Sequence, residues 1–137
     1  MREIKFRAWD EKEKCWVSGF AIHQSGMFSD WAGCKKINGQ CVAEADWKYQ
    51  HEIPHIKIMQ YTGLKDRHGQ EIYEGDILRD DEMGLNVVRW EDGSFWLEMF
   101  YEGGQSLMEH LSDYNEVCEV IGNIYENPEL LKGEENA

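Results

Sequence analysis

The feature that most constrains the fold is the dipeptide Asp92-Gly93, which lies between two segments that carry apolar residues at alternate positions. Segment 86–90 precedes the dipeptide and segment 95–100 follows it. Asp-Gly is strongly favoured in the tight turns of β-hairpins, and a period of two is that of a half-buried strand. The sequence therefore predicts a β-hairpin over residues 86–100.

Further short strands are predicted on both sides of this hairpin. Residues 4–8 alternate apolar with basic side chains, residues 10–14 form a charged turn, and residues 15–17 return, which predicts an N-terminal hairpin. Other apolar segments bounded by turn residues are 56–61, 71–74, 77–79 and 117–121. We expect a mainly β protein with short helices (α+β), built as a small twisted sheet with an SH3-like barrel core.

Two short helices are expected beside the strands. Asn127 as N-cap and Pro128 at the first helical position predict one helical turn, and residues 106–111 are interpreted as another short helix. A chain of 137 residues fits one domain, here 1–132, with an irregular insertion of loops and short strands at 24–52. Residues 133–137 are expected to be a frayed tail.

The net charge of −13 is distributed unevenly. Residues 1–50 carry eight Lys/Arg and seven Asp/Glu, residues 51–100 carry five and eleven, and residues 101–137 carry one and nine. Such a gradient repels a phosphate backbone and an anionic membrane surface. The charge is interpreted first as a source of solubility, and second as a surface for a basic protein partner or a mimic of DNA.

No N-terminal apolar run typical of a signal peptide is present, and no stretch approaches the length of a membrane span. We therefore expect a cytoplasmic protein. Its four cysteines are expected to be reduced thiols, because disulfides are rare in that compartment.

Three stretches of the chain resemble the YopX-like proteins of bacterial phages and prophages. They are IKFRAWD at residues 4–10, MQYTGLKD at 59–66 with GQEIYEGDI at 69–77, and VIGNIYENPELL at 120–131. The resemblance implies a phage or prophage origin, expression in the bacterial cytoplasm and self-association, and it implies no particular activity. The middle stretch is also explained as scaffold, because Gly63, Gly69 and Gly75 suit tight backbone turns.

No metal site is expected. Cys34 and Cys41 are too loosely spaced for a zinc-binding pair, and Pro54 argues against a helix that holds both His51 and His55. The acidic residues 80–82 lack the glycine and the distal glutamate of a calcium loop, so a solvated turn is favoured there.

Catalytic interpretations are equally weak. Cys118 follows His110 by eight residues, but Glu116 and Glu119 are expected to raise the pKa of its thiol, which favours packing in a strand. For the carboxylates at 71–76 we find no neighbour that separates their pKa values, as acid–base catalysis requires. We therefore expect no enzymatic activity and no cofactor.

The expected function is a non-enzymatic protein-binding module. Its contact residues are predicted to be an exposed aromatic face and the acidic C-terminal side, with core packing as the alternative for the tryptophans. The predicted partner-binding residues are Trp90, Trp96, Glu102, Glu109, Glu116 and Glu119. One alternative is a nucleic-acid-binding module that uses the N-terminal third. A weaker one is a metal-dependent hydrolase that uses Asp76 and residues 80–82.

Overall fold

The computed structural model describes residues 3–17, 20–22, 28–31, 34–37, 40–43, 47–50, 56–82, 84–100 and 106–131, and between residues 18 and 55 it describes the backbone only. The chain divides into two compact units. We call Met1–Phe6 with Met59–Ala137 the large unit, and Arg7–Ile58 the small unit.

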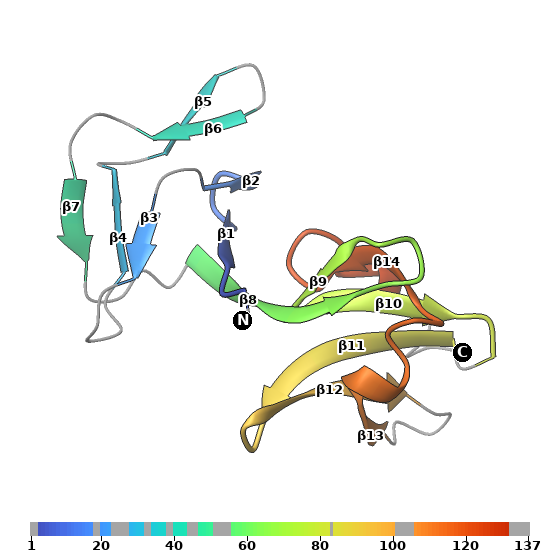
Figure 1. The fold of residues 1–137 in the computed structure, drawn as a ribbon. Helices are drawn as coiled ribbons and strands as arrows, with labels where there is room; N and C mark the ends of the chain where they lie inside the picture. Colours follow the sequence, from blue (N-terminus) through green and yellow to red (C-terminus); the bar gives the residue numbers. More distant parts are fainter. Residues whose placement is uncertain are drawn as a thin grey trace. The chain divides into compact units, whose positions relative to one another are not determined.

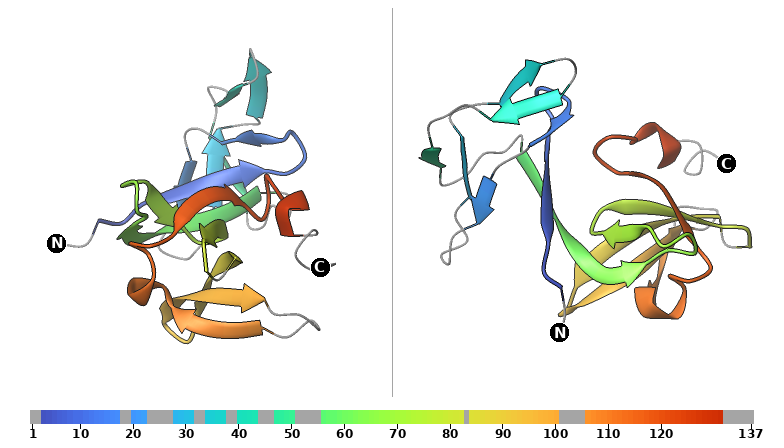
Figure 2. Two further views of the ribbon diagram at one scale, coloured as in Figure 1. Left: turned by 90° about the vertical axis from the view of Figure 1, so that its right-hand side faces the viewer. Right: turned by 45° about the horizontal axis from the view of Figure 1, so that its top comes forward.

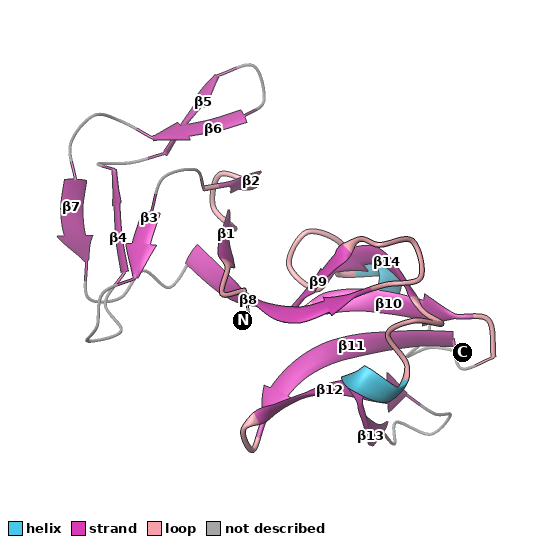
Figure 3. Ribbon diagram, in the orientation of Figure 1, coloured by secondary structure: helices cyan, strands magenta, loops and turns pink. Residues whose placement is uncertain are grey.

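The large unit is built on a curled five-stranded sheet with the strand order β13-β12-β11-β10-β14 (Figure 1). The neighbouring strands are antiparallel. The strands are β10 (Asp76–Asp80), β11 (Gly84–Glu91), β12 (Ser94–Phe100), β13 (Ser106–His110) and β14 (Glu119–Asn123). This sheet confirms the predicted mainly β fold, as the abundance of strands in Figure 3 illustrates.

The predicted hairpin is confirmed as β11 and β12. Trp90 pairs with Phe95 and Glu91 pairs with Ser94, so that Asp92 and Gly93 form a two-residue turn. Their φ angles are 48° and 79°. A turn with two positive φ angles matches the right-handed twist of the strands that it joins, which explains why Asp-Gly is found here.

One face of the sheet carries the core of the large unit. Val88 on β11 and Leu97 on β12 lie on this face and are completely buried, and Ile77 on β10 and Val87 on β11 are completely buried on the other face. The core cluster contains Ile72, Leu78, Val88, Leu97, Met99, Leu111 and Cys118, with Leu64, Phe95, Tyr114 and Val120 packed against it. Burial of this apolar face is the main stabilising contribution, at about 25 cal/mol per Å².

A long strand, β8 (Ile56–Lys65), begins in the small unit and continues into the large unit, as Figure 2 shows. In the large unit it pairs with β9 (Glu71–Tyr73), and the register shifts between Tyr61 and Lys65. Gly63 lies in this irregularity with a φ of 86°, a conformation that a residue with a Cβ rarely adopts. Gly69 and Gly75 also have positive φ angles, 81° and 86°, so the expectation that the backbone requires glycine at these positions is confirmed.

The small unit contains the predicted N-terminal hairpin. Strand β1 (Phe6–Asp10), which begins at the boundary between the units, pairs with β2 (Cys15–Trp16), and Trp9 lies opposite Trp16. The Asp10 Oδ1 atom accepts the backbone N–H groups of Lys12 and Glu13, both at 2.9 Å, which fixes the charged turn.

The backbone of the remaining small unit forms further short strands. Strands β3 (Phe20–Ile22), β4 (Phe28–Trp31) and β7 (Trp47–Gln50) make one sheet, and β5 (Cys34–Ile37) pairs with β6 (Gln40–Ala43). Segment 24–52 thus contains regularly paired strands. The small unit includes more residues than that segment, because it extends from Arg7 to Ile58.

The two helix predictions have different outcomes. Residues 129–131 form a helical turn, as predicted, but the Asn127 Oδ1 atom accepts the backbone N–H of Asn123 at 3.3 Å. The helix predicted at 106–111 is wrong. Pairing with β12 holds Ser106–His110 in a strand, and a short 3-10 helix, η1 (Leu111–Asp113), follows.

Residues 133–137, predicted to be a frayed tail, lie outside the described residues. No helix in the described part of the chain is long and apolar enough to cross a membrane.

Candidate functional site

The two units differ sharply in charge. The large unit contains seven Lys/Arg and 20 Asp/Glu, whereas the small unit contains seven of each kind. The whole net charge of −13 therefore belongs to the large unit. Any site that uses this charge is to be found there.

Most described cations of the large unit are paired with nearby carboxylates. The Lys5 Nζ atom lies 2.5 Å from Glu71 Oε2, and the Arg89 Nε atom lies 3.1 Å from Glu98 Oε2. The hydrogen bond from Lys5 also lowers the pKa of Glu71. These pairs neutralise charge within the unit, so that few of its described cations are available to compensate the remaining acidic side chains.

Glu119, a predicted partner-binding residue, lies at the centre of an ion-pair network. Its carboxylate accepts a hydrogen bond from Arg79, and it lies 3.1 Å from Arg67 Nη2 and 3.2 Å from His68 Nε2. The hydrogen bonds from Arg79 and then Arg67 lower the pKa of Glu119 to about 2. Because these cations already compensate its charge, Glu119 is less suited to a partner than the sequence suggested.

Asp66 connects the loop after β8 to strand β14 through hydrogen bonds of its side chain. Its Oδ1 atom accepts the N–H groups of His68 at 2.8 Å and Gln70 at 2.9 Å, and its Oδ2 atom accepts that of Val120 at 2.9 Å. Burial acts to raise the pKa of Asp66, but the three backbone donors outweigh burial and lower it. The sequence analysis missed this role, although an aspartate before a Gly-containing turn is typical of side-chain-bonded turns.

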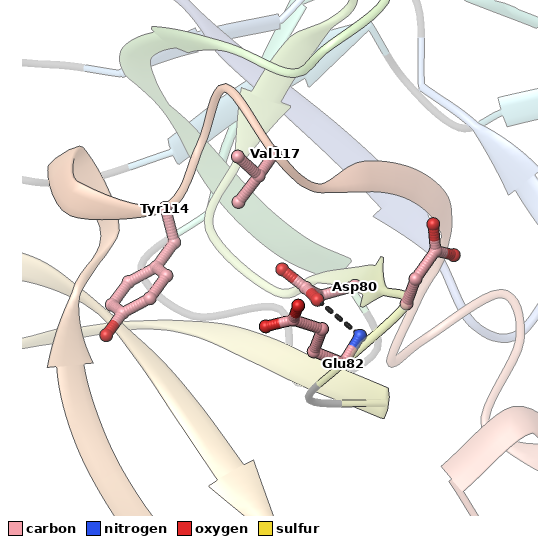
Figure 4. Close-up of a pocket in the computed structure, with 5 residues that line it drawn as sticks. Asp80, Glu82, Tyr114 and Val117 are labelled. Carbon is pink, nitrogen blue, oxygen red and sulfur yellow. Dashed lines mark hydrogen bonds between the residues drawn. The ribbon is translucent and has the colours of Figure 1, made fainter.

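A hollow of about 330 Å³ lies beside the turn that follows β10. It is lined by Asp80, Asp81, Glu82, Tyr114 and Val117. Figure 4 shows the carboxylates of Asp80 and Glu82 close together, with Tyr114 and Val117 across the hollow, and the Asp80 Oδ1 atom accepts the Glu82 N–H at 2.7 Å. Carboxylates beside an aromatic ring and an exposed valine suit the ammonium or guanidinium end and the apolar stem of a basic side chain.

The acidic turn at 80–82 contains the residue types that bind divalent metal ions. Within the described residues, no group of three or more His, Cys, Asp or Glu side chains is arranged to hold a metal ion. Asp76, the other carboxylate of the hydrolase alternative, is 1% exposed, and its Oδ2 atom accepts the Tyr73 N–H at 2.7 Å. It therefore has a structural role in the turn after β9.

The cysteines and histidines for which a zinc site is not expected lie outside the part of the chain whose side chains the structure describes. His51 and His55 lie outside the described residues, as do the side chains of Cys34 and Cys41. The prediction that the chain binds no zinc therefore stays a prediction.

Cys118 is completely buried in the core of the large unit. Burial first, and then the charge of Asp80, raise the pKa of its thiol to about 11. The predicted direction is correct, but the sequence analysis assigned the effect to Glu116 and Glu119. His110, the suggested base, is exposed and stacks on Trp96 with the ring centroids 4.1 Å apart.

The carboxylates at 71–76 differ from expectation, and the prediction that no neighbour separates their pKa values is wrong. Burial raises the pKa of Glu74, whereas Lys5 lowers that of Glu71, so their environments do separate the two pKa values. Each shift has a local structural cause.

The predicted single aromatic face is wrong. Trp90 pairs with Phe95, whereas Trp96 pairs with Arg89, so consecutive positions place the two tryptophans on opposite faces of the hairpin. Trp90 is 47% exposed and contacts the Phe95 ring, while the Trp96 Nε1 atom donates to the Glu91 carbonyl at 2.9 Å. They therefore do not form one continuous binding surface.

The remaining predicted glutamates differ in position. Glu116 is exposed in the turn before Cys118, next in sequence to Val117 of the hollow, and Glu109 is half-buried on β13. Glu102 lies outside the described residues. The sequence analysis missed Tyr114 and Val117, which no local pattern distinguishes from core residues.

Comparisons with known proteins identify relatives of the chain. The family model described as YopX protein matches residues 5–132. The crystal structure of protein EF1440 from Enterococcus faecalis is similar over 96% of this chain and 99% of its own, with 31% sequence identity and a TM-score of 0.61. Protein yopX from Bacillus subtilis covers 95% of this chain and 98% of its own, with 21% identity and a TM-score of 0.53, which shows the fold alone. No curated protein matches the chain.

Proposed function

The chain belongs to the YopX family, and on this premise we propose that it is a non-enzymatic accessory protein of bacterial phages or prophages that binds a basic protein. We place this activity in the bacterial cytoplasm, and we assign it to the acidic large unit.

The observation that carries the proposal is a group of acidic side chains without an ion-pair partner among the described residues. Asp113 and Glu116 are exposed in and after η1, and Glu82 lies at the hollow. Exposed ion pairs contribute only about 0–1 kcal/mol each, so these charges favour a partner mainly by accelerating association. Tyr114 and Val117 add apolar contact area beside them.

The nucleic-acid alternative receives less support. A protein that binds a phosphate backbone needs several available Lys or Arg side chains. The small unit has a net charge of zero, and Arg67, Arg79 and Arg89 of the large unit are paired with carboxylates.

Self-association, which the family resemblance implies, stays a prediction. Trp90 of the hairpin, 47% exposed, is an apolar side chain that a second copy would cover. Light scattering over micromolar concentrations measures it, and a monomer at every concentration would contradict it.

The proposed function is tested by affinity capture from bacterial cells followed by mass spectrometry. The bait is the full chain, compared with a Glu109→Lys/Glu116→Lys variant and with a Lys12→Glu control from the small unit. We expect a basic protein that the wild type and the control retain and that the doubly reversed variant loses. Equal capture by all three baits, or recovery of nucleic acid without protein, would contradict the proposal.

A further inference from the structure

The two edge strands of the five-stranded sheet, β14 and β13, differ in the hydrogen bonds that their outward backbone groups make. At β14, the Val120 N–H donates to Asp66, and the Cys118 carbonyl next to the strand accepts the Arg67 N–H at 2.9 Å. At β13, no described backbone group other than those of β12 bonds to residues 106–110. As far as the described residues extend, the outward N–H and C=O groups of β13 therefore have no strand beside them, and another strand can bond to them.

The side chains of β13 indicate which kind of strand fits. Leu107 pairs with Met99, and Glu109 pairs with Leu97, so Leu107 and Glu109 lie on the same face of the sheet, two positions apart. Leu107 is 43% exposed, and Glu109 has no ion-pair partner among the described residues. Side chains directly opposite each other on neighbouring strands interact, and opposite charges stabilise such a pair.

We propose that the β13 edge accepts an extended segment of a partner protein as a sixth strand, with an apolar side chain beside Leu107 and a Lys or Arg beside Glu109. This inference rests on the proposed function, because it names the part of the basic partner that is recognised. Main-chain hydrogen bonds supply affinity in such complexes, and alternate side chains supply specificity. The recognised segment carries its apolar and basic residues two positions apart.

The probe is a synthetic peptide with the repeat Lys-Thr-Val-Thr, titrated into the full chain and followed by amide NMR and hydrogen exchange. We expect shifts concentrated at Ser106–His110, and slower exchange of the alternate β13 amides that face outward. A Glu-Thr-Val-Thr peptide is the charge control. Glu109→Lys is expected to reverse the preference between the two peptides.

A matched pair of N-methylated peptides tests the hydrogen bonds themselves. One carries N-methyl groups at the threonines, and the other carries them at lysine and valine. Alternate N–H groups of a strand point to the same side, so only one of the two peptides can still bond to β13. We expect that peptide to retain affinity and the other to bind at least roughly tenfold more weakly.

Three results would overturn the inference. The first is a set of NMR shifts that avoids β13, and the second is equal binding of both N-methylated peptides. The third is protection of the β13 amides that rises with protein concentration in the absence of peptide, because that result would assign the edge to a second copy. If the peptide fails while the captured partner remains sensitive to Glu116→Lys, the inference is lost and the proposed function stands.

Discussion

Two regions of the large unit, the β14 end of the five-stranded sheet and the segment that joins β13 to β14, use carboxylates for different purposes. At the β14 end, Asp66 and Glu119 have their charge compensated by backbone N–H groups and by Arg67 and Arg79. In the segment that joins β13 to β14, Asp113 and Glu116 have no such partners among the described residues. Formal charge alone therefore does not identify a binding surface. A carboxylate that accepts hydrogen bonds from N–H groups of its own chain stabilises the fold and is less available to a partner.

The first prediction tests whether the β14 end depends on Asp66. Asp66→Ala removes the acceptor of three backbone N–H groups, and a buried donor without a partner costs about 1–3 kcal/mol. We expect the free energy of unfolding to fall by at least about 3 kcal/mol in urea denaturation. Asp113→Ala, the matched change in the segment between β13 and β14, should leave it within about 0.5 kcal/mol. Equal effects of the two substitutions would remove the distinction between structural and available carboxylates.

The second prediction concerns alkaline pH. The pKa of Cys118 is raised to about 11 in the folded protein, so the folded state keeps its proton where the unfolded thiol has already lost it. The stabilisation is complete below the unfolded pKa and is lost as the pH rises through the folded pKa. We expect unfolding free energy to fall by about 2 kcal/mol between about pH 9 and 11. Cys118→Ala should be less stable overall but should lack this decline.

The third prediction concerns acid pH and has a smaller effect, because the network of Glu119 is close to solvent and is screened by salt. The folded pKa of about 2 lies below the ordinary value of 4.5. Glu119 therefore stabilises the fold above the unfolded pKa, and this contribution is lost as the pH falls through the folded pKa. In Glu119→Gln, the free energy of unfolding should fall less than in the wild type between about pH 4.5 and 2, which is the acid limb of its pH profile.

The control for this acid limb is Glu116→Gln, which should retain the profile of the wild type. An acid limb that is unchanged in Glu119→Gln would show that the ion-pair network does not persist in solution.

The parts of the fold that the sequence predicted are local ones. The Asp92-Gly93 turn encodes its own hairpin, and its two-residue length also places Trp90 and Trp96 on opposite faces, which a count of positions would have revealed. The strand β13 was missed because its helix-favouring residues Leu107–Glu109 are held extended by pairing with β12.

The candidate site was less predictable because its contacts are distant in sequence. Asp66 and Val120 are 54 residues apart, and Glu119 meets Arg79 across 40 residues. No local pattern shows which carboxylates have acquired such partners. The acidic gradient was therefore visible in the sequence, whereas the division between structural and available carboxylates required the fold.

The most direct test is the association rate of the captured basic protein with the purified chain, measured by stopped flow over a series of salt concentrations. For the wild type we predict a rate that falls steeply with salt, because exposed charges are screened within about 8 Å at physiological ionic strength. Glu116→Lys should lower the rate and reduce its dependence on salt, and Lys12→Glu should change neither. A rate that ignores both salt and Glu116→Lys would contradict the account and leave the acidic charge with no function beyond solubility.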